Sequence, residues 1–258
     1  MSKFSNTLND SFKLFIENPK FVIPKLVIAF FYSLMILATI GLSVSAIEEP
    51  TMDLLIFSII LLGATIVVSL VDVFVGLMYP VLVKQVKDNQ AIHLRNAAKA
   101  VLKNSFKSFP SIIAVELGFV LVVFILSLPL VFFIESLDLY MILSSILYVV
   151  ILLVVVFLFY SLYPIIIFEN ESIVGSLKRS INVSLKNRKE VSKVTLFSFF
   201  LSLLSYGIAF SIEFFPGGNY SLWFWVAFII VRVLTAYVYS YLFVLNPIFY
   251  LNYSGSKK

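Results

Sequence analysis

Three ionisable side chains lie well inside long apolar runs of this 258-residue sequence: Asp72, Glu116 and Arg232. A charged group inside a bilayer costs at least about 3 kcal/mol on insertion scales, so each should face a partner or a wet cavity. Three uses are open to them: a structural ion pair, an Arg that extends to the outer surface, or a path for a substrate or protons. The helical rise gives the depth of each charge in the membrane, and Arg232 should be closer in depth to Asp72 than to Glu116. The predicted ion pair is therefore Asp72–Arg232.

The elements that must position these charges are membrane spans. Apolar residues make up 61% of the sequence and charged residues only 13%, with a mean hydropathy of +1.04. Soluble domains are about half apolar, so a soluble class is excluded. Each apolar run is close to the ~20 residues that cross a bilayer, and the first is too long for a signal peptide. The sequence predicts an all-α membrane protein, one domain over 1–258, with six spans at about 22–46, 54–83, 110–134, 139–167, 194–215 and 221–250.

The basic residues orient these spans. All but one of the 19 Lys and Arg residues lie at the N-terminus, in the second and fourth loops, or at the C-terminus. Because cytoplasmic loops are enriched in Lys and Arg, we expect a multi-pass protein of the cell membrane with both termini in the cytoplasm. Segments 84–108 and 168–193 should lie on the same side.

An internal repeat is the next expectation. Pro80, Pro164 and Pro247 recur at nearly equal intervals, each close to the predicted cytoplasmic end of a span. Lys and Asn residues recur with them, as in Asn18, Asn104 and Asn187. Two spans per unit keep every unit in the same orientation, which predicts a pseudo-threefold axis along the membrane normal. The alternative is that loop spacing alone produces the period. The predicted units are about 4–83, 90–167 and 172–250, with the prolines at span exits.

An amphipathic cytoplasmic-side helix should precede each hairpin. In the clearest copy, Ile173, Leu177, Ile181 and Leu185 recur every four residues, and the opposite face is basic. This pattern is typical of a helix that lies on an anionic leaflet, so membrane lipid is the first partner predicted. A protein partner docking at the cytoplasmic face is the second interpretation. Nucleic acid is not predicted, because the positive charge is juxtamembrane and carries no binding motif.

Catalytic signatures are missing from the sequence. There is no Cys and a single His, and we find no Gly-rich phosphate loop, nucleophile elbow or zinc-protease motif. The sequence therefore predicts no enzyme activity, no cofactor and no metal site.

One stretch resembles a known family. It runs from Tyr163-Pro164 through Glu169, Gly175, Arg179 and Ser180 to Asn187, and the opening Asn18-Pro19 with Pro24 fits the same pattern. The family is a broad prokaryotic group of multi-span membrane proteins. It includes the membrane domain joined to some glycerophosphodiester phosphodiesterases and many stand-alone archaeal proteins of unknown role. The resemblance implies no catalytic residues, because the phosphodiesterase chemistry of those proteins belongs to a separate soluble barrel.

Two functional classes stay open at this point. The first is an accessory or scaffold protein that binds lipid or a partner at the cytoplasmic face, with Asp72 and Arg232 in a structural role. The second is a transporter or permease subunit with a central cavity that involves Asp72, Glu116 and Arg232. We favour the first class. Only three charged residues lie inside the spans, and two of them are expected to pair, which leaves too few to line a transport path.

Overall fold

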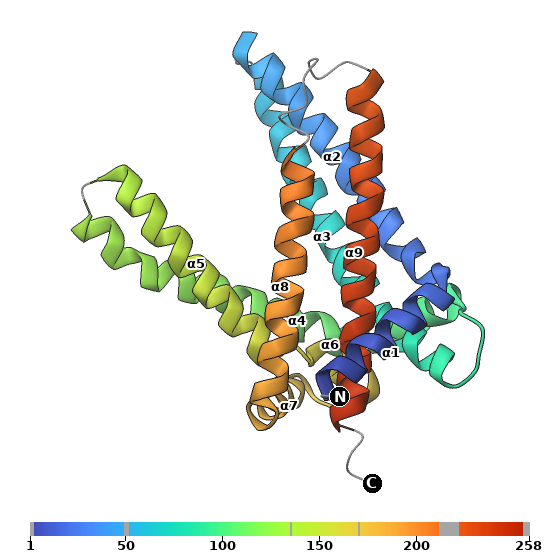
Figure 1. Ribbon diagram of the computed structural model, residues 1–258. Helices are drawn as coiled ribbons and strands as arrows, with labels where there is room; N and C mark the ends of the chain where they lie inside the picture. Colours follow the sequence, from blue (N-terminus) through green and yellow to red (C-terminus); the bar gives the residue numbers. More distant parts are fainter. Residues whose placement is uncertain (1–2, 49–51, 135, 170, 212–221, 255–258) are drawn as a thin grey trace. The chain divides into compact units, whose positions relative to one another are not determined.

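The computed structural model describes residues 3–48, 52–134, 136–169, 171–211 and 222–254. Every regular element in these ranges is helical, as predicted (Figure 1). The elements are α1 (Lys3–Glu17), the 3-10 helix η1 (Pro19–Val22), α2 (Ile23–Glu48), α3 (Met52–Lys87), α4 (Leu94–Phe133), α5 (Leu137–Phe159), α6 (Leu162–Phe168), α7 (Ile173–Lys186), α8 (Arg188–Ser211) and α9 (Leu222–Ser254).

Six stretches of helix in the described residues are long and apolar enough to cross a membrane. They agree with the six predicted runs and suggest a multi-pass membrane protein. The turn predicted at 216–219 and the basic C-terminus at 257–258 lie outside the described residues. The candidate spans are Pro19–Thr39, Leu55–Lys87, Ser108–Phe133, Leu137–Phe168, Arg188–Ala209 and Leu222–Tyr253.

The chain forms two compact units that do not follow the predicted repeat boundaries. What we call the α2–α3 unit comprises Ser11–Ala98 and Leu201–Val244. The α4–α7 unit comprises Met1–Asp10, Lys99–Phe200 and Leu245–Lys258.

The α2–α3 unit is built on an antiparallel hairpin. Helices α2 and α3 pack side by side, and η1 leads directly into α2 (Figure 1). Pro19 sits in the first turn of η1 and Pro24 in the first turn of α2, where a missing N–H breaks no intrahelical bond. Tyr79 of α3 is fully buried and connects α3 to η1, the element that precedes the hairpin. Its hydroxyl donates to the Phe21 carbonyl at 2.9 Å and is also 3.1 Å from Ser240 Oγ of α9.

The α4–α7 unit contains a second hairpin of α4 and α5. The Ser136 hydroxyl caps the start of α5 by accepting from the Leu139 amide, and Phe119 packs edge-on against Tyr148 between the two helices. The helix breaks after Phe159, and α6 then carries the chain through Pro164. Ser172 caps α7 by accepting from the Gly175 amide at 3.1 Å.

One detail of the expected repeat differs in the structure. Segments α1 and α7 are separate amphipathic helices, as predicted, but the basic segment from Leu94 continues without a break into the span of α4. The first segment ends at Asn18 because a residue before proline disfavours helical geometry, and no proline follows Asn104 until Pro110. Pro80 and Pro247 lie inside α3 and α9, which continue beyond them, and their place at span exits stays a prediction.

The recurring asparagines share one local interaction. The side-chain amides of Asn18, Asn104 and Asn187 each donate to the carbonyl four residues earlier, at 3.0, 3.2 and 3.0 Å. At Asn18 this bond serves a carbonyl at the end of α1, whereas the Val183 carbonyl also accepts from the Asn187 backbone N–H and α4 continues unbroken through Asn104. The pseudo-threefold relation among the hairpins stays a prediction.

Candidate functional site

A cavity of about 640 Å³ lies within the α2–α3 unit, lined from α2, α3, α8 and α9. This volume is in the range of pockets that hold small organic ligands. Apolar and aromatic side chains make up most of its wall. Its polar lining residues are Lys25, Tyr32, Asp72, Ser205, Tyr206, Arg232, Thr235 and Tyr239.

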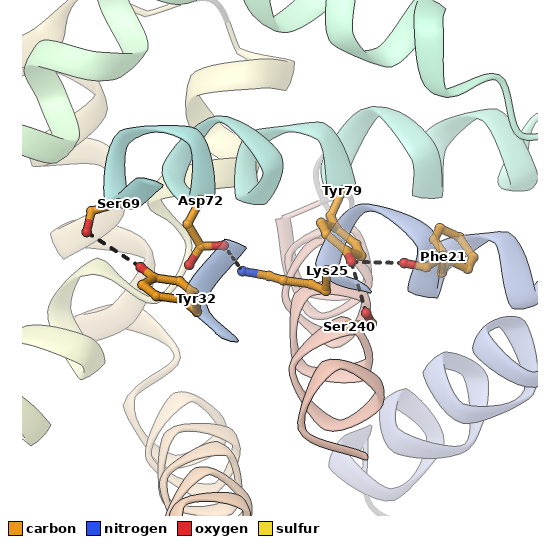
Figure 2. A network of polar contacts seen from close by, with 7 residues as sticks. All are labelled: Phe21, Lys25, Tyr32, Ser69, Asp72, Tyr79 and Ser240. Carbon is orange, nitrogen blue, oxygen red and sulfur yellow. Dashed lines mark hydrogen bonds and ion pairs between the residues drawn. The ribbon is translucent and has the colours of Figure 1, made fainter. Parts of the chain in front are cut away.

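An ion pair joins α2 to α3 on the wall of this cavity. Lys25 Nζ is 2.5 Å from Asp72 Oδ1, and the Lys25 side chain is only 5% exposed (Figure 2). The same ammonium lies 4.0 Å from the centroid of the Phe243 ring, which adds a cation–π contact. Lys25 is therefore held by α2, α3 and α9 together. Tyr32, two turns after Lys25 on α2, and Ser69, one turn before Asp72 on α3, add a weaker polar contact between their hydroxyl oxygens at 3.5 Å.

Arg232 lines the same cavity but has no carboxylate partner among the described residues. The sequence predicted Asp72 as its partner, and this was wrong, because Asp72 is bound by Lys25. Lys25 stands inside the first apolar run, close enough to its start to resemble the basic residues of the N-terminus. The Arg232 guanidinium instead lies 5.0 Å from the Phe228 ring, and its buried Nε has no hydrogen-bond partner within the described part of the chain.

Two hydroxyl groups of the cavity wall are likewise unsatisfied. Ser205 Oγ of α8 and Thr235 Oγ1 of α9 are buried and have no hydrogen-bond partner within the described residues, and Ser205 is only 2% exposed. Buried polar groups are normally hydrogen-bonded, so three such atoms around one cavity require an explanation. Ser205, Thr235 and Arg232 thus offer hydrogen-bond donors that have no acceptor among the described residues. The formal charge of the cavity wall is positive, because it contains two cations, Lys25 and Arg232, and one carboxylate, Asp72.

Glu116, the third charge singled out in the sequence, does not belong to this site. It lies on α4 in the other unit, exposed on the helix surface, and it is not among the residues that line the cavity. Of the three predicted site residues, the structure therefore brings Asp72 and Arg232 to one cavity and leaves Glu116 out.

A second polar region, which we call the α7 junction, lies where α5, α6, α7 and the end of α9 meet in the α4–α7 unit. Pro164 has no N–H, so the Tyr160 carbonyl four residues earlier loses its helical donor. The side-chain amide of Asn246 replaces that donor by hydrogen-bonding to the Tyr160 carbonyl. Ser180 and Ser184 of α7 both donate to the carbonyl of Leu158, at 3.1 and 3.2 Å.

Glu169 completes the α7 junction. Its carboxylate accepts two hydrogen bonds from Arg179, the shorter at 3.0 Å, and another from the Tyr250 hydroxyl. These hydrogen bonds from the guanidinium raise the pKa of Arg179. Several residues that carried the family resemblance thus act as structural contacts: Arg179 joins α7 to Glu169 at the end of α6, and Ser180 joins α7 to the Leu158 carbonyl of α5. At Gly175, an added Cβ would lie 2.8 Å from a Glu171 carboxylate oxygen, the far end of an exposed side chain that can move aside.

No family model, curated protein or solved structure matches the chain.

Three functional residues were missed from the sequence. Lys25 was visible as a cation within an apolar run, and its position three residues into α2 was the available signal. Ser205 and Thr235 gave none, because Ser and Thr are frequent throughout the apolar runs and only the packing of α8 with α9 shows which of them face the cavity.

Proposed function

We propose that this protein is a multi-pass membrane protein that binds an amphiphilic molecule, with an apolar body and an anionic group, in the cavity of the α2–α3 unit. The observation that carries the proposal is Arg232, a cation in a candidate span that lines a cavity without an acidic partner among the described residues. An unpaired Arg inside a membrane is costly, and a ligand anion would offset that cost. Ser205 and Thr235 supply further donors for the anion, and the apolar wall suits a hydrocarbon chain.

The proposal is for a binding protein of the accessory or scaffold class, not an enzyme. We place both termini, the basic segments and α7 on the cytoplasmic side, which is supported by the one-sided distribution of Lys and Arg. Membership in the family that the stretch 163–187 resembles is likewise a proposal, supported by those residues.

A fluorescent fatty acid tests the function directly. Purified protein in nanodiscs is titrated with a dansyl-labelled fatty acid and, separately, with its methyl ester. Charge-assisted hydrogen bonds contribute roughly 1.5–3 kcal/mol, so Arg232→Gln should weaken binding of the acid about 10- to 100-fold. Binding of the ester should be weak in the wild type and unchanged in the variant.

Two further variants control this experiment. Ala236 lines the cavity and is 3% exposed, so Ala236→Phe should fill the site and abolish binding. Lys189→Gln removes an exposed cation far along the sequence from the cavity and should have no effect. Equal affinity of Arg232→Gln, Ala236→Phe and the wild type would refute the proposal.

Transport is the second candidate, because Asp72 and Arg232 line one cavity and Lys25–Asp72 could be broken and re-formed as a ligand passes. A transporter should move the labelled fatty acid across proteoliposome membranes faster than protein-free vesicles do. Saturable binding without accelerated flux favours the accessory function, whereas flux that is lost in Arg232→Gln favours transport.

A further inference from the structure

Helix α7 divides its surface into three arcs. Ser176, Ser180 and Ser184, spaced four residues apart, form a buried arc and are at most 1% exposed. This arc is the one that contacts the protein, through the two hydrogen bonds to the Leu158 carbonyl. Small side chains allow such close approach of two helices. The side of α7 that packs on the protein is thus mostly serine, with Val183 beside the serines and packed against Ile165 and Tyr250.

Of the apolar row predicted from the sequence, Ile181 and Leu185 lie outside this contact and form an open arc with Val174, which was not part of that row. Val174 is 57% exposed and Leu185 54%, and Ile181 between them is half-buried. In the helical projection this open apolar arc lies next to the serine arc, and the basic arc with Lys178 and Lys186 lies on its other side. A helix at a water surface would gain nothing by burying serine and exposing Val and Leu. The arrangement fits a helix bordered by protein, hydrocarbon and water in turn.

The position of α7 in its own unit fits the same environment. It packs on the end of α5, within the candidate span Leu137–Phe168, and that end of α5 also exposes Val154. Charge points to the sign of the lipid. Helix α7 contains basic residues and no acidic ones, and Arg188 and Lys189 come directly after it. Of the described carboxylates close to α7 in the sequence, Glu169 contacts Arg179 and Glu190 contacts Lys193, at 3.0 Å in each case; Glu171, just before α7, is exposed.

We propose that α7 lies in the membrane–water interface, with the arc of Val174, Ile181 and Leu185 among the acyl chains and its basic arc against anionic lipid headgroups. The serine arc sets its rotation, because only this rotation presents the apolar arc to lipid while the Leu158 carbonyl remains bonded. This inference is independent of the cavity and does not rest on its ligand.

Single cysteines test the rotation, because the native chain has none. Val174→Cys, Leu185→Cys and, as the matched control on the exposed polar side, Asn182→Cys are labelled with bimane in the full-length protein in nanodiscs. Nitroxide-labelled lipid should quench the labels at 174 and 185 several-fold more than that at 182, and aqueous iodide should show the reverse order. Iodide access to 174 and 185 equal to that at 182 would overturn the proposal and leave a water-exposed protein-docking surface.

The lipid charge is tested with the same labels. At equal mole fraction, nitroxide phosphatidylglycerol should quench the label at 174 more than nitroxide phosphatidylcholine does. Lys178→Gln with Lys186→Gln should remove this preference while quenching by phosphatidylcholine persists. Equal quenching by both lipids in the wild type would overturn the anionic part of the proposal. Gel filtration of each labelled protein verifies that it is folded before the comparison is made.

Discussion

The α7 junction and the cavity of the α2–α3 unit use polar groups in opposite ways. At the α7 junction the carbonyl freed by Pro164 and the charged groups are matched: Asn246 binds the Tyr160 carbonyl, and Glu169 binds both Arg179 and Tyr250. In the cavity, Lys25 and Asp72 are matched, but Arg232 beside them has no such partner among the described residues. Matched groups hold elements together, whereas an unmatched cation on a cavity wall is available to a ligand.

Hydroxyl groups alone do not make this distinction. Ser161, Thr195 and Ser198 in the α4–α7 unit also lack hydrogen-bond partners within the described residues. A lone buried hydroxyl costs about 1–3 kcal/mol, which a fold can tolerate. An unpaired guanidinium is a much larger penalty. What sets the cavity apart is therefore Arg232, with Ser205 and Thr235 beside it as secondary donors.

The largest expected loss of stability comes from breaking the Lys25–Asp72 ion pair of the cavity. Lys25→Met leaves the Asp72 carboxylate without its cation, so the free energy of unfolding should fall by roughly 3–5 kcal/mol. Lys25→Met with Asp72→Asn should lose less than the two separate losses added together. Reversible unfolding of purified protein in detergent, monitored by helical circular dichroism, measures each term.

The same cycle with the wrong partner provides the control. Asp72→Asn and Arg232→Met should show much weaker coupling than Lys25→Met and Asp72→Asn, because no ion pair joins Asp72 to Arg232. Coupling between Asp72 and Arg232 together with additivity for Lys25 and Asp72 would reinstate the pair that the sequence suggested and reject the one described.

The next largest loss of stability is expected for Asn246→Ala, which removes the donor to the Tyr160 carbonyl at the α7 junction. The Tyr160 carbonyl would be left without a donor, which should lower the free energy of unfolding by about 1–3 kcal/mol. In a Pro164→Ala background residue 164 regains an N–H that can serve this carbonyl, so the loss from Asn246→Ala should shrink. Asn182→Ala, on the exposed side of α7, should change stability by less than about 0.5 kcal/mol. An undiminished loss in the Pro164→Ala background would contradict the role assigned to Asn246.

Arg179→Met should have a smaller effect. Arg179 is 48% exposed, and exposed ion pairs contribute at most about 1 kcal/mol. Because Glu169 raises the pKa of Arg179, this stabilisation is fully present below the ordinary pKa of an arginine side chain and is lost only above it. The difference between wild type and variant should therefore be constant from neutral to mildly alkaline pH. A difference that shrinks in that range would show that another group titrates at the α7 junction.

The sequence was sufficient to predict the helices but not to predict which side chains contact one another. Six apolar runs predicted six long helices because hydrophobic length alone decides whether a helix is long enough to span. The amphipathic pattern also predicted α1 and α7 as helices. Which side chains meet depends on rotation and register. Lys25 binds Asp72 because α2 and α3 are antiparallel and face one another at that height, and a one-dimensional pattern does not contain that information.

Helix α7 shows the same limit at finer scale. Its apolar row was evident from the spacing of Ile173, Leu177, Ile181 and Leu185, but the serines between them carried no signal of their own. Only the packing on α5 shows that they are the buried side. Similarly, Pro164 signalled a freed carbonyl, yet nothing in the sequence connected it to Asn246, a residue more than eighty positions away.

The smallest expected effect on stability distinguishes the cavity from the α7 junction most directly. Arg232→Met replaces an unpaired cation with an apolar side chain of similar length, next to Phe228 and the apolar wall of the cavity. Replacing buried charged groups with apolar ones is often neutral or stabilising, so the free energy of unfolding without ligand should stay within about 1 kcal/mol of wild type or rise. With a saturating fatty acid the order should reverse, because ligand binding stabilises only the protein that retains the cation. At a ligand concentration of about 100 times its dissociation constant, the wild type should gain about 2.7 kcal/mol and the variant far less. A large loss of stability in ligand-free Arg232→Met would show that Arg232 is matched by a protein group after all, and the cavity would then be a structural region like the α7 junction.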